Sequence, residues 1–392
     1  MRPVRVLMLT WEYPPLTGGA AAHVDGLSRA LGQAGHDVVV LTVGRTGSTS
    51  PATTAVRVLR ASGELPWIPD EDVVTSAASA NHHLVRLTTE LGDWRPDVVH
   101  AHNWQCAWAA TTIAVLHDAP LVTTFHTTLR GQHGGRVPPG EPSTIHAVES
   151  WLAHGSRQVI APSMFMSREV LSGFELPADR IHRVPNGIDP TWWAVGEWPE
   201  SRPPLVLTWG RVQYEKGFQV LARAISTLRS RVPDLECIIA GRGSYLPELQ
   251  SQVDIEGVND IVQLVGFVTD VVLRDLVHRA GCVVIPSLYE PFGIVALEAL
   301  AGGAPLIAAR TGGLAELIAG TGAGLLFEPG NADELAACIE RVLDDPGLAD
   351  EMRLRGAALL GARYSWAAIA KATALIYAGC TPAETDAALS PS

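Results

Sequence analysis

Two glutamates separated by seven residues, Glu290 and Glu298, are the side chains in this sequence with the clearest potential for chemistry. Glu290 follows the apolar, β-branched run Cys282–Ile285, which predicts a buried strand. Pro291 suits the first turn of a helix, and Glu298 is then expected about two turns into that helix, among apolar residues. A carboxylate in such a place needs a partner. Two interpretations follow: a ligand site, or a helix cap followed by an internal salt bridge.

The expected start of this helix offers a place for an anion. Its first N–H groups, those of Phe292, Gly293 and Ile294, lack partners within the helix, and the helix dipole favours negative charge there. Gly293 has no Cβ, so a ligand could approach the backbone closely. These three residues are therefore candidates for contact with a phosphate or a sugar.

A second candidate is the turn Gly210–Gly217, which follows the expected strand Leu205–Trp209. It carries Arg211 and Lys216. These two cations suit a pyrophosphate, because an arginine can bind it through two hydrogen bonds and a lysine acts as a point charge. Pairing of Glu215 with either cation is the structural alternative. The turn is not a Walker A loop, because neither serine nor threonine follows the lysine.

Three further turns give weaker signals of the same kind. Gly241–Gly243 and Gly266–Val268 each follow an expected strand, and a nucleotide base could lie against Val268. The third turn, before an expected helix, contains Thr311, Gly312 and Gly313, whose backbone amides could reach a phosphate or a sugar hydroxyl. Each could be an ordinary turn, but all four turns are expected on one edge of one sheet.

The N-terminal half begins with a glycine turn of its own. Gly18 and Gly19 come after the expected strand Val4–Leu9 and open a helix, which is the usual start of a nucleotide-type parallel sheet. The pattern is not G-x-G-x-x-G, and no acidic residue ends the next strand. We therefore interpret the loop as an approach to a phosphate or sugar, with a simple turn as the alternative.

Histidines occur at the expected ends of two strands. His100 and His102 flank the end of the strand Asp97–Ala101, and His126 ends the strand Leu121–Phe125. Two histidines two residues apart could share a face and bind a metal, but no third ligand stands out by spacing, so no metal site is predicted. The alternative for each histidine is a hydrogen-bonded core residue.

The elements that must position these residues alternate between strand and helix along the chain. Such alternation with short links predicts parallel sheets covered by helices on both faces, with ligands beyond the carboxyl ends of the strands. The stretch Ala194–Pro204, rich in proline and charge, is the best domain boundary. The sequence therefore predicts an α/β protein with two doubly wound, Rossmann-like domains, residues 1–197 and 198–364.

Composition narrows the function classes. The formal net charge is -12 and no long basic run is present, which argues against binding to nucleic acid or to an anionic membrane. The five cysteines have neither metal-ligand nor C-x-x-C spacing, which is typical of core residues in a reduced cytosolic protein. No apolar run approaches the roughly 20 residues of a membrane span, and no signal peptide is recognised. A cytoplasmic protein is expected.

Both strong motifs resemble those of the retaining glycosyltransferases of family 4. The stretch Tyr289–Ala299 is similar to the E-x7-E element of that family, and Gly210–Gly217 is similar to its G-R-x-x-x-E-K-G turn. The likeness runs from Trp11 to Trp366 and, within the family, is greatest to actinobacterial glycogen-synthase-like α-glucosyltransferases.

This resemblance implies the GT-B fold, in which two such domains face each other across a cleft. The N-terminal domain would bind the acceptor and the C-terminal domain the nucleotide sugar. Residues 365–380 would form a helix that crosses back to the N-terminal domain, and residues 381–392 are expected to be a disordered tail.

The resemblance also implies roles for the candidate residues. Arg211 and Lys216 would hold the donor diphosphate, Glu290 would orient the donor sugar, His126 would line its reacting face, and Glu298 would hold the ribose. Further donor contacts are expected from Gly18, Gly19, Phe292, Gly293, Ile294, Thr311, Gly312, Gly313 and Val268. Weaker acceptor candidates are Trp11, Glu12, His102 and Asn103. Two departures from the family pattern, alanines after Gly19 and Asn103 where aspartate is frequent, fall in the acceptor half.

The expected function is transfer of a hexose, with glucose favoured, from a nucleoside diphosphate sugar to a hydroxyl of an α-glucan or maltooligosaccharide, with retention at the anomeric carbon. No cofactor and no metal are expected, and the donor would be a UDP-, ADP- or GDP-linked co-substrate. The alternatives are a specialised-metabolite transferase acting on a small sugar, cyclitol or pseudo-oligosaccharide, a sugar-nucleotide 2-epimerase, and a non-catalytic sugar-binding module. The oligomeric state is left open, with a homodimer as one option.

Overall fold

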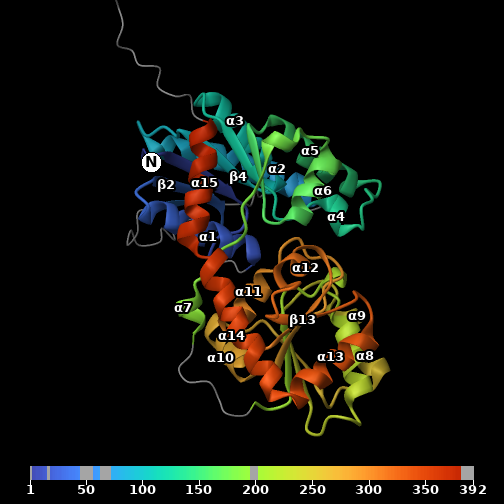
Figure 1. The fold of residues 1–392 in the computed structure, drawn as a ribbon. Helices are drawn as coiled ribbons and strands as arrows, with labels where there is room; N and C mark the ends of the chain where they lie inside the picture. Colours follow the sequence, from blue (N-terminus) through green and yellow to red (C-terminus); the bar gives the residue numbers. More distant parts are fainter. Residues whose placement is uncertain (1, 16–17, 45–55, 62–71, 195–201, 381–392) are drawn as a thin grey trace, which may run out of the picture. The chain divides into compact units, whose positions relative to one another are not determined.

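The computed structural model describes residues 2–15, 18–44, 56–61, 72–194 and 202–380 (Figure 1). The chain forms two compact units: Met1–Pro185 together with Trp366–Ser392, and Asn186–Ser365. Residues 186–194, which the sequence analysis placed in the first domain, group with the second unit. The segment 365–380, expected as a returning helix, groups with the first unit from Trp366 onward. The expected disordered tail, 381–392, lies outside the described residues.

The first unit is built on a parallel sheet in the order β3-β2-β1-β4-β5-β6-β7. Its strands are β1 (Arg5–Thr10), β2 (Asp37–Val43), β3 (Val56–Ala61), β4 (Val98–His102), β5 (Leu121–Thr124), β6 (Gln158–Ala161) and β7 (Ile181–Arg183). Strand β1 pairs with β2 on one side and with β4 on the other, so that Thr10 lies opposite both Thr42 and His102. The order therefore reverses between β1 and β4, which is where ligands bind in open α/β sheets.

Alternate residues of β1 face two separate cores. Val6 and Met8 pack with residues of α1 (Gly19–Gln33) and α15 (Trp366–Cys380), and these two helices lie side by side in Figure 1. Leu7 and Leu9 pack on the other face, in one cluster with side chains from α2 (Val73–Leu87), α3 (Ala107–Leu116), α5 (Glu141–Gly155) and α6 (Met164–Phe174). Shorter helices in this unit are η1 (Thr88–Leu91), η2 (Trp104–Cys106), α4 (Leu129–Gln132) and η3 (Ala178–Arg180).

The second unit repeats the same topology with the order β10-β9-β8-β11-β12-β13. The strands are β8 (Leu205–Trp209), β9 (Glu236–Ala240), β10 (Val262–Gly266), β11 (Cys282–Ile285), β12 (Leu306–Ala309) and β13 (Gly324–Phe327). All of the pairings are parallel. The reversal in strand order falls between β8 and β11.

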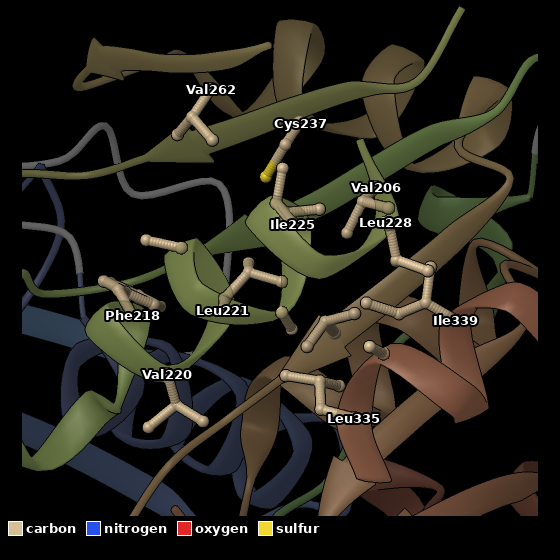
Figure 2. Close-up of a cluster of buried hydrophobic side chains, with 14 of the residues drawn as sticks. Val206, Phe218, Val220, Leu221, Ile225, Leu228, Cys237, Val262, Leu335 and Ile339 are labelled. Carbon is tan, nitrogen blue, oxygen red and sulfur yellow. The ribbon is translucent and has the colours of Figure 1, made fainter. Parts of the chain in front are cut away.

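Helices cover both faces of this second sheet. Figure 2 shows one core, in which Val206, Cys237 and Val262 of the sheet meet Phe218 and Leu221 of α8 (Phe218–Leu228). Helices α9 (Leu246–Glu256) and α13 (Ala332–Asp344) complete it. The opposite face packs against α10 (Asp270–Arg279), α11 (Ile294–Ala301), α12 (Gly312–Ile318) and the end of α14 (Pro346–Arg363). The remaining short helices are α7 (Pro190–Trp193) and η4 (Tyr214–Lys216).

Several elements differ from the expectation. Strand β3 and helices α6 and α9 were not expected from the sequence. Helix α11 begins at Ile294, so Pro291 precedes the helix instead of opening it, and Glu298 lies little more than one turn in. Gly312 and Gly313 form the first residues of α12 and do not precede it. The physical reason at α11 is Gly293, whose φ of 101° is outside the helical range.

Two expectations from composition can be compared with the structure. All five cysteines are unpaired, and four of them, Cys106, Cys237, Cys282 and Cys380, are buried. Burial raises the pKa of each of these thiols, as expected for small core residues. Within the described residues, no helix combines the length and the apolar character needed to cross a bilayer.

Candidate functional site

In the second unit, the charged residues of both strong motifs meet at the reversal point of the sheet. The turn with Arg211 and Lys216 leaves β8, and Glu290 lies in the loop that leaves β11, which pairs with β8. A hydrogen bond of 2.8 Å from the Leu288 N–H to the Glu215 carbonyl oxygen connects the two loops. The parallel neighbours thus bring together residues that are more than 70 positions apart in the chain.

Lys216 and Glu290 form an ion pair. The Lys216 Nζ lies 2.8 Å from the Glu290 Oε2, and the Ser287 hydroxyl donates to the same oxygen over 3.2 Å. The side chains are 22% and 11% exposed, so the pair is only partly open to water. The side chain of Arg211 is exposed and makes no hydrogen bond or ion pair within the described residues. The alternative pairing of Glu215 with a cation is not observed in that part of the chain.

Gly217 makes the close approach of these two loops possible. Its φ is 71°, and a Cβ added there would lie 1.9 Å from the carbonyl oxygen of Pro286. No side chain fits at that distance, and only glycine adopts the conformation without strain. The glycine that closes the motif therefore allows the Lys216 turn to lie against the loop that leaves β11 and carries Glu290.

The start of α11 presents unpaired amides, as the sequence predicts. Gly293 is the N-cap, with φ 101°, and no side chain caps the helix. The N–H groups of Phe292, Gly293 and Ile294 donate to no acceptor within the described residues. The helix-cap alternative for Glu290 is therefore not observed. These amides remain available to an anion or a hydroxyl group.

Glu298 has an unexpected partner. The indole Nε1–H of Trp209, at the end of β8, donates to the Glu298 Oε2 over 2.9 Å. No cation pairs with Glu298 within the described residues, although an internal salt bridge was one expectation. Burial raises the pKa of Glu298 to about 7, the Trp209 hydrogen bond acts to lower it, and the charge of Asp270 acts to raise it.

The three weaker turns follow strands of the same sheet, as predicted; hydrogen bonds connect the first two to each other and the third to the loop that carries Glu290. The Gly241 N–H donates to the Gly266 carbonyl oxygen over 2.7 Å. The Thr311 hydroxyl donates to the Leu288 carbonyl oxygen over 3.2 Å. The Gly313 N–H donates to the Glu290 carbonyl oxygen over 2.9 Å, so this amide is engaged within the protein.

Val268 is only partly buried at this edge, and the neighbouring aromatic ring of Phe267 is 50% exposed. Gly312 opens α12 with φ 48°, and its N–H donates to no described acceptor. An exposed ring beside an open strand end offers an apolar surface on which a planar group could lie.

In the first unit, three histidines meet at the reversal point of the sheet. His102 ends β4, His126 follows β5, and His23 lies on α1, the helix that follows β1. The His102 Nδ1 and the His126 Nε2 are 3.1 Å apart, and the rings of His23 and His126 meet edge to face at 4.8 Å between centroids. Burial, with the neighbouring imidazoles as a smaller cause, lowers the pKa of His102 and of His126 well below 6.5.

His100 belongs to the core. Its Nδ1 lies 2.6 Å from the hydroxyl of Tyr377 on α15, and its Nε2 lies 2.8 Å from the Thr124 hydroxyl. Burial lowers the pKa of His100 to about 3. Both ring nitrogens are engaged, so the alternative interpretation of a hydrogen-bonded core histidine is correct for this residue.

Asn103 joins the ends of β4 and β5. It adopts φ 60° and ψ 177°, a backbone conformation outside the left-handed helical region that residues other than glycine rarely adopt. Its Oδ1 accepts the backbone N–H of His126 over 2.8 Å, and its own N–H donates to the Thr124 carbonyl oxygen over 3.0 Å. An aspartate would accept the same bond from His126, so this departure from the family pattern preserves the positioning of that residue.

One group in the described residues could hold a metal ion: His23, His102 and His126, whose ligand nitrogens lie within 4.8 Å of one another. Neutral imidazoles would suit zinc or another late transition metal. In the structure, however, two of these nitrogens are at hydrogen-bond distance from each other. The His102 Nε2 is buried without a partner in the described chain, whereas a ligating histidine almost always donates its second N–H to an acceptor. The observed geometry is that of a hydrogen-bonded pair.

The remaining N-terminal candidates surround the start of α1. Gly18 is its N-cap and Gly19 its first residue, with no side-chain cap. A Cβ on Gly18 would lie 2.8 Å from a carboxylate oxygen of Glu12, so this acid lies beside the helix start. Trp11 is partly buried and packs against two apolar clusters. Trp11 therefore contributes to the core, and Glu12 is the side chain that adds charge at this helix start.

Sequence reasoning missed two side chains of these groups. His23 lies on a helix of mostly small and apolar residues, and nothing in its spacing relates it to His102 or His126. Trp209 ends an apolar strand and is typical of a core residue. Its position, the last residue before the Arg211 turn, is the one signal that could have identified it, because strand ends face the ligand edge.

Two family models match the chain. "Glycosyltransferase Family 4" matches residues 17–192 and "Glycosyl transferases group 1" matches residues 196–358. The chain is 37% identical to the glycogen synthase of Mycobacterium tuberculosis, over 95% of this chain and 94% of that protein. It is 31% identical to the D-inositol 3-phosphate glycosyltransferase of an Arthrobacter species, over 89% of this chain and 87% of the relative.

Solved structures share the fold at low identity. Sucrose-phosphate synthase from Thermosynechococcus elongatus aligns with a TM-score of 0.81 and 22% identity, over 96% of this chain and 98% of that one. Anabaena HepE in complex with UDP and glucose aligns with 0.77 and 21%, over 96% and 99%. The catalytic domain of Arabidopsis thaliana starch synthase IV bound to ADP and acarbose aligns with 0.77 and 17%, over 97% and 99%.

Proposed function

Because this chain belongs to the glycosyltransferases of group 1 and family 4 and has the two parallel-sheet domains of the GT-B fold, we propose that it transfers glucose from a nucleoside diphosphate sugar to a hydroxyl of an α-glucan or maltooligosaccharide, with retention. One observation carries the proposal. The Lys216–Glu290 ion pair, the exposed Arg211 and the unpaired amides at the start of α11 all lie in loops that follow the carboxyl ends of the paired strands β8 and β11. The 37% identity to a glycogen synthase supports the choice of acceptor.

The chemistry follows from where charge develops. The bond between the anomeric carbon and the diphosphate breaks, a bond to the acceptor oxygen forms on the same face, and the acceptor proton leaves with the diphosphate. Negative charge grows on the diphosphate as it departs. Arg211 and Lys216 carry fixed positive charge beside that position, and preorganised charge of this kind lowers the barrier.

The three remaining functional side chains would bind the donor. The ion pair with Lys216 holds the Glu290 carboxylate in place, with its second oxygen available to a sugar hydroxyl. Glu298 has one oxygen on the Trp209 indole and one available to the ribose. His126 would line the reacting face of the sugar. None of these roles requires a protein nucleophile.

Nucleotide-bound relatives of this fold support a nucleotide-sugar donor, since HepE holds UDP and glucose and starch synthase IV holds ADP. The identity of the base, the lack of a metal requirement, a cytoplasmic location and a homodimer stay predictions. So do the assignment of acceptor binding to the N-terminal domain and of donor binding to the C-terminal domain.

A second candidate acceptor is a cyclitol or small sugar. The 31% identity to a D-inositol 3-phosphate glycosyltransferase supports it. Incubation with UDP-, ADP- or GDP-glucose and either a maltooligosaccharide or an inositol phosphate distinguishes the two by the product formed. An isomerised donor sugar would instead indicate an epimerase, and binding without turnover would indicate a sugar-binding module.

The decisive experiment compares Arg211→Ala with Arg279→Ala. Arg279 is an exposed arginine at the end of α10, on the opposite edge of the same sheet. We expect Arg211→Ala to lower kcat/KM by about 10²- to 10³-fold, the cost of losing one preorganised contact to developing charge. Arg279→Ala should retain the wild-type value, and both variants should melt as the wild type does. Full activity in a folded Arg211→Ala protein would refute the proposal.

A further inference from the structure

The pair His102 and His126 shares a single ring-to-ring contact with an unusual geometry. The ring planes are only 15° apart, yet the centroids are 5.4 Å apart while the His102 Nδ1 and the His126 Nε2 are separated by 3.1 Å. Rings stacked face to face would not place one nitrogen of each ring so close while the centroids stay so far apart. The imidazoles therefore meet end to end, as a donor and an acceptor do.

Only one of the two nitrogens in this contact can carry a proton when both rings are neutral and hydrogen-bonded to each other. A neutral imidazole has one N–H donor and one acceptor nitrogen, and burial among other histidines disfavours the charged form of both residues. The ring that carries the proton of this contact thus determines the state of the two outer nitrogens, the His102 Nε2 and the His126 Nδ1. Each outer nitrogen is either an N–H donor or an unprotonated acceptor.

The outer nitrogens lie in different surroundings. The His102 Nε2 is buried and has no hydrogen-bond partner in the described chain. Its neighbour His100 is engaged at both nitrogens by Tyr377 and Thr124, so it offers no partner. His126 is partly exposed, and its Nδ1 is not among the buried polar atoms that lack a partner.

Two proton arrangements are then possible. If His126 donated its Nε2–H, the second nitrogen of His102 would have to be a buried N–H without an acceptor, and orphaned buried N–H groups are rare. If His102 donates its Nδ1–H, the buried His102 Nε2 is left as an unprotonated nitrogen, and His126 carries its own proton on the accessible Nδ1.

We propose that His102 is a positioning residue that donates its Nδ1–H to the His126 Nε2 and thereby fixes His126 as an Nδ1–H donor toward the ligand. Asn103 holds the backbone of the same residue through the 2.8 Å bond to the His126 N–H, so His126 is held at both its main chain and its ring. The ligand class that such a donor recognises is an acceptor oxygen of a sugar. This last step rests on the proposed function, whereas the proton arrangement itself does not.

Ring nitrogen resonances test the arrangement directly. In the protein labelled with ¹⁵N-histidine, long-range ¹H–¹⁵N spectra distinguish protonated from unprotonated ring nitrogens, and the signals that disappear in His126→Asn identify His126. We expect the His126 Nδ1 to be protonated and its Nε2 unprotonated. The reverse pattern would overturn the proposal. A shift of the His23, His102 and His126 signals on treatment with EDTA would also overturn it, because it would reveal a metal centre.

Variants of His102 test the consequence. His102→Leu removes the donor and should release the His126 tautomer, whereas His102→Asn keeps an N–H near the position of Nδ1 and should restore the wild-type His126 pattern. Transfer activity should fall roughly 10- to 100-fold in His102→Leu, the cost of removing an orienting partner of a functional histidine, and recover in part in His102→Asn. His82→Asn, which removes an exposed imidazole, should leave the spectrum of His126 and the activity unchanged.

The two readouts separate the ways in which the reasoning could fail. If the spectra show the expected tautomer but no sugar is transferred by the wild type, the proposed function fails and the proton arrangement stands. If His102→Leu leaves the His126 tautomer unchanged, His102 does not fix it and this inference fails, whatever the activity.

Discussion

Replacing Glu298 by glutamine should change how the stability of the protein depends on pH. Burial raises the pKa of Glu298 from 4.5 to about 7 in the folded state, whereas in the unfolded chain it is expected near 4.5. Between these values the folded state holds a proton that the unfolded state has lost. The free energy of unfolding therefore decreases as pH rises through this window.

The magnitude follows from the size of the shift. A gap of about 2.5 pH units at about 1.4 kcal/mol per unit corresponds to about 3 kcal/mol, present in full below pH 4.5 and lost above pH 7. Glutamine has the same shape and does not ionise, and its amide oxygen can accept the Trp209 indole N–H that now reaches Glu298. Glu298→Gln should therefore equal the wild type at pH 5 and exceed its unfolding free energy by up to about 3 kcal/mol at pH 8.

Urea unfolding at pH 5, 6, 7 and 8, followed by tryptophan fluorescence, measures the difference. Glu248→Gln, which removes an exposed carboxylate on α9, is the control and should follow the wild-type curve. Trp209→Phe should make the wild-type trend steeper at the high-pH end, because the indole hydrogen bond acts to lower the pKa of Glu298. If Glu298→Gln lost stability relative to the wild type as pH rose, the carboxyl group would not be held in its protonated form, and the reasoning would be refuted.

Three further substitutions test the packing around the sites. Lys216→Met removes the cation 2.8 Å from Glu290. Because a mostly buried carboxylate then loses its partner, the free energy of unfolding measured in urea should fall by about 1–3 kcal/mol. An unchanged free energy of unfolding would mean that the ion pair does not hold the two loops together. Gly217→Ala adds a Cβ that would lie 1.9 Å from a backbone carbonyl oxygen. It should lower the free energy of unfolding by about 2 kcal/mol or more. A thermal midpoint equal to that of the wild type would contradict the close contact between the two loops. Tyr377→Phe removes the hydroxyl 2.6 Å from the His100 Nδ1 and should lower the free energy of unfolding by about 1–3 kcal/mol. Nucleotide binding, measured by calorimetry, should stay the same. A change in nucleotide binding would show that His100 belongs to the ligand site and not to the core alone.

The pattern of strands and helices could be predicted over most of the chain because buried parallel strands and apolar helix faces leave a strong local signal. Strands β8 and β11 begin and end at the residues expected from the sequence, Leu205–Trp209 and Cys282–Ile285. Strand β3 was missed because charged residues interrupt its apolar pattern, and α9 because its sequence is largely polar. In these elements the neighbouring strand or helix, and not the local pattern, determines the structure.

The group of charged residues beyond the carboxyl ends of β8 and β11 could also be predicted in outline. Parallel strands place their carboxyl ends together, so the Arg211 turn and Glu290 were expected on one edge from their positions after strands. Which cation pairs with which acid was not predictable. Four charged groups, Arg211, Glu215, Lys216 and Glu290, allowed more than one pairing, and the structure shows the pair Lys216–Glu290 beside the close backbone contact at Gly217.

The sequence by itself determined the alternation of strands and helices, the turns that carry charge and the family motifs, because each of these is a property of a short continuous segment. Only the tertiary structure decided the partners: the Trp209 indole for Glu298, Tyr377 for His100, and His102 for His126. Each of these contacts joins residues far apart in the chain, and strand order brings them within hydrogen-bond distance. Residue spacing carries no record of strand order, and the protonation of Glu298 and of the histidines depends on burial, which exists only once the sheets have formed.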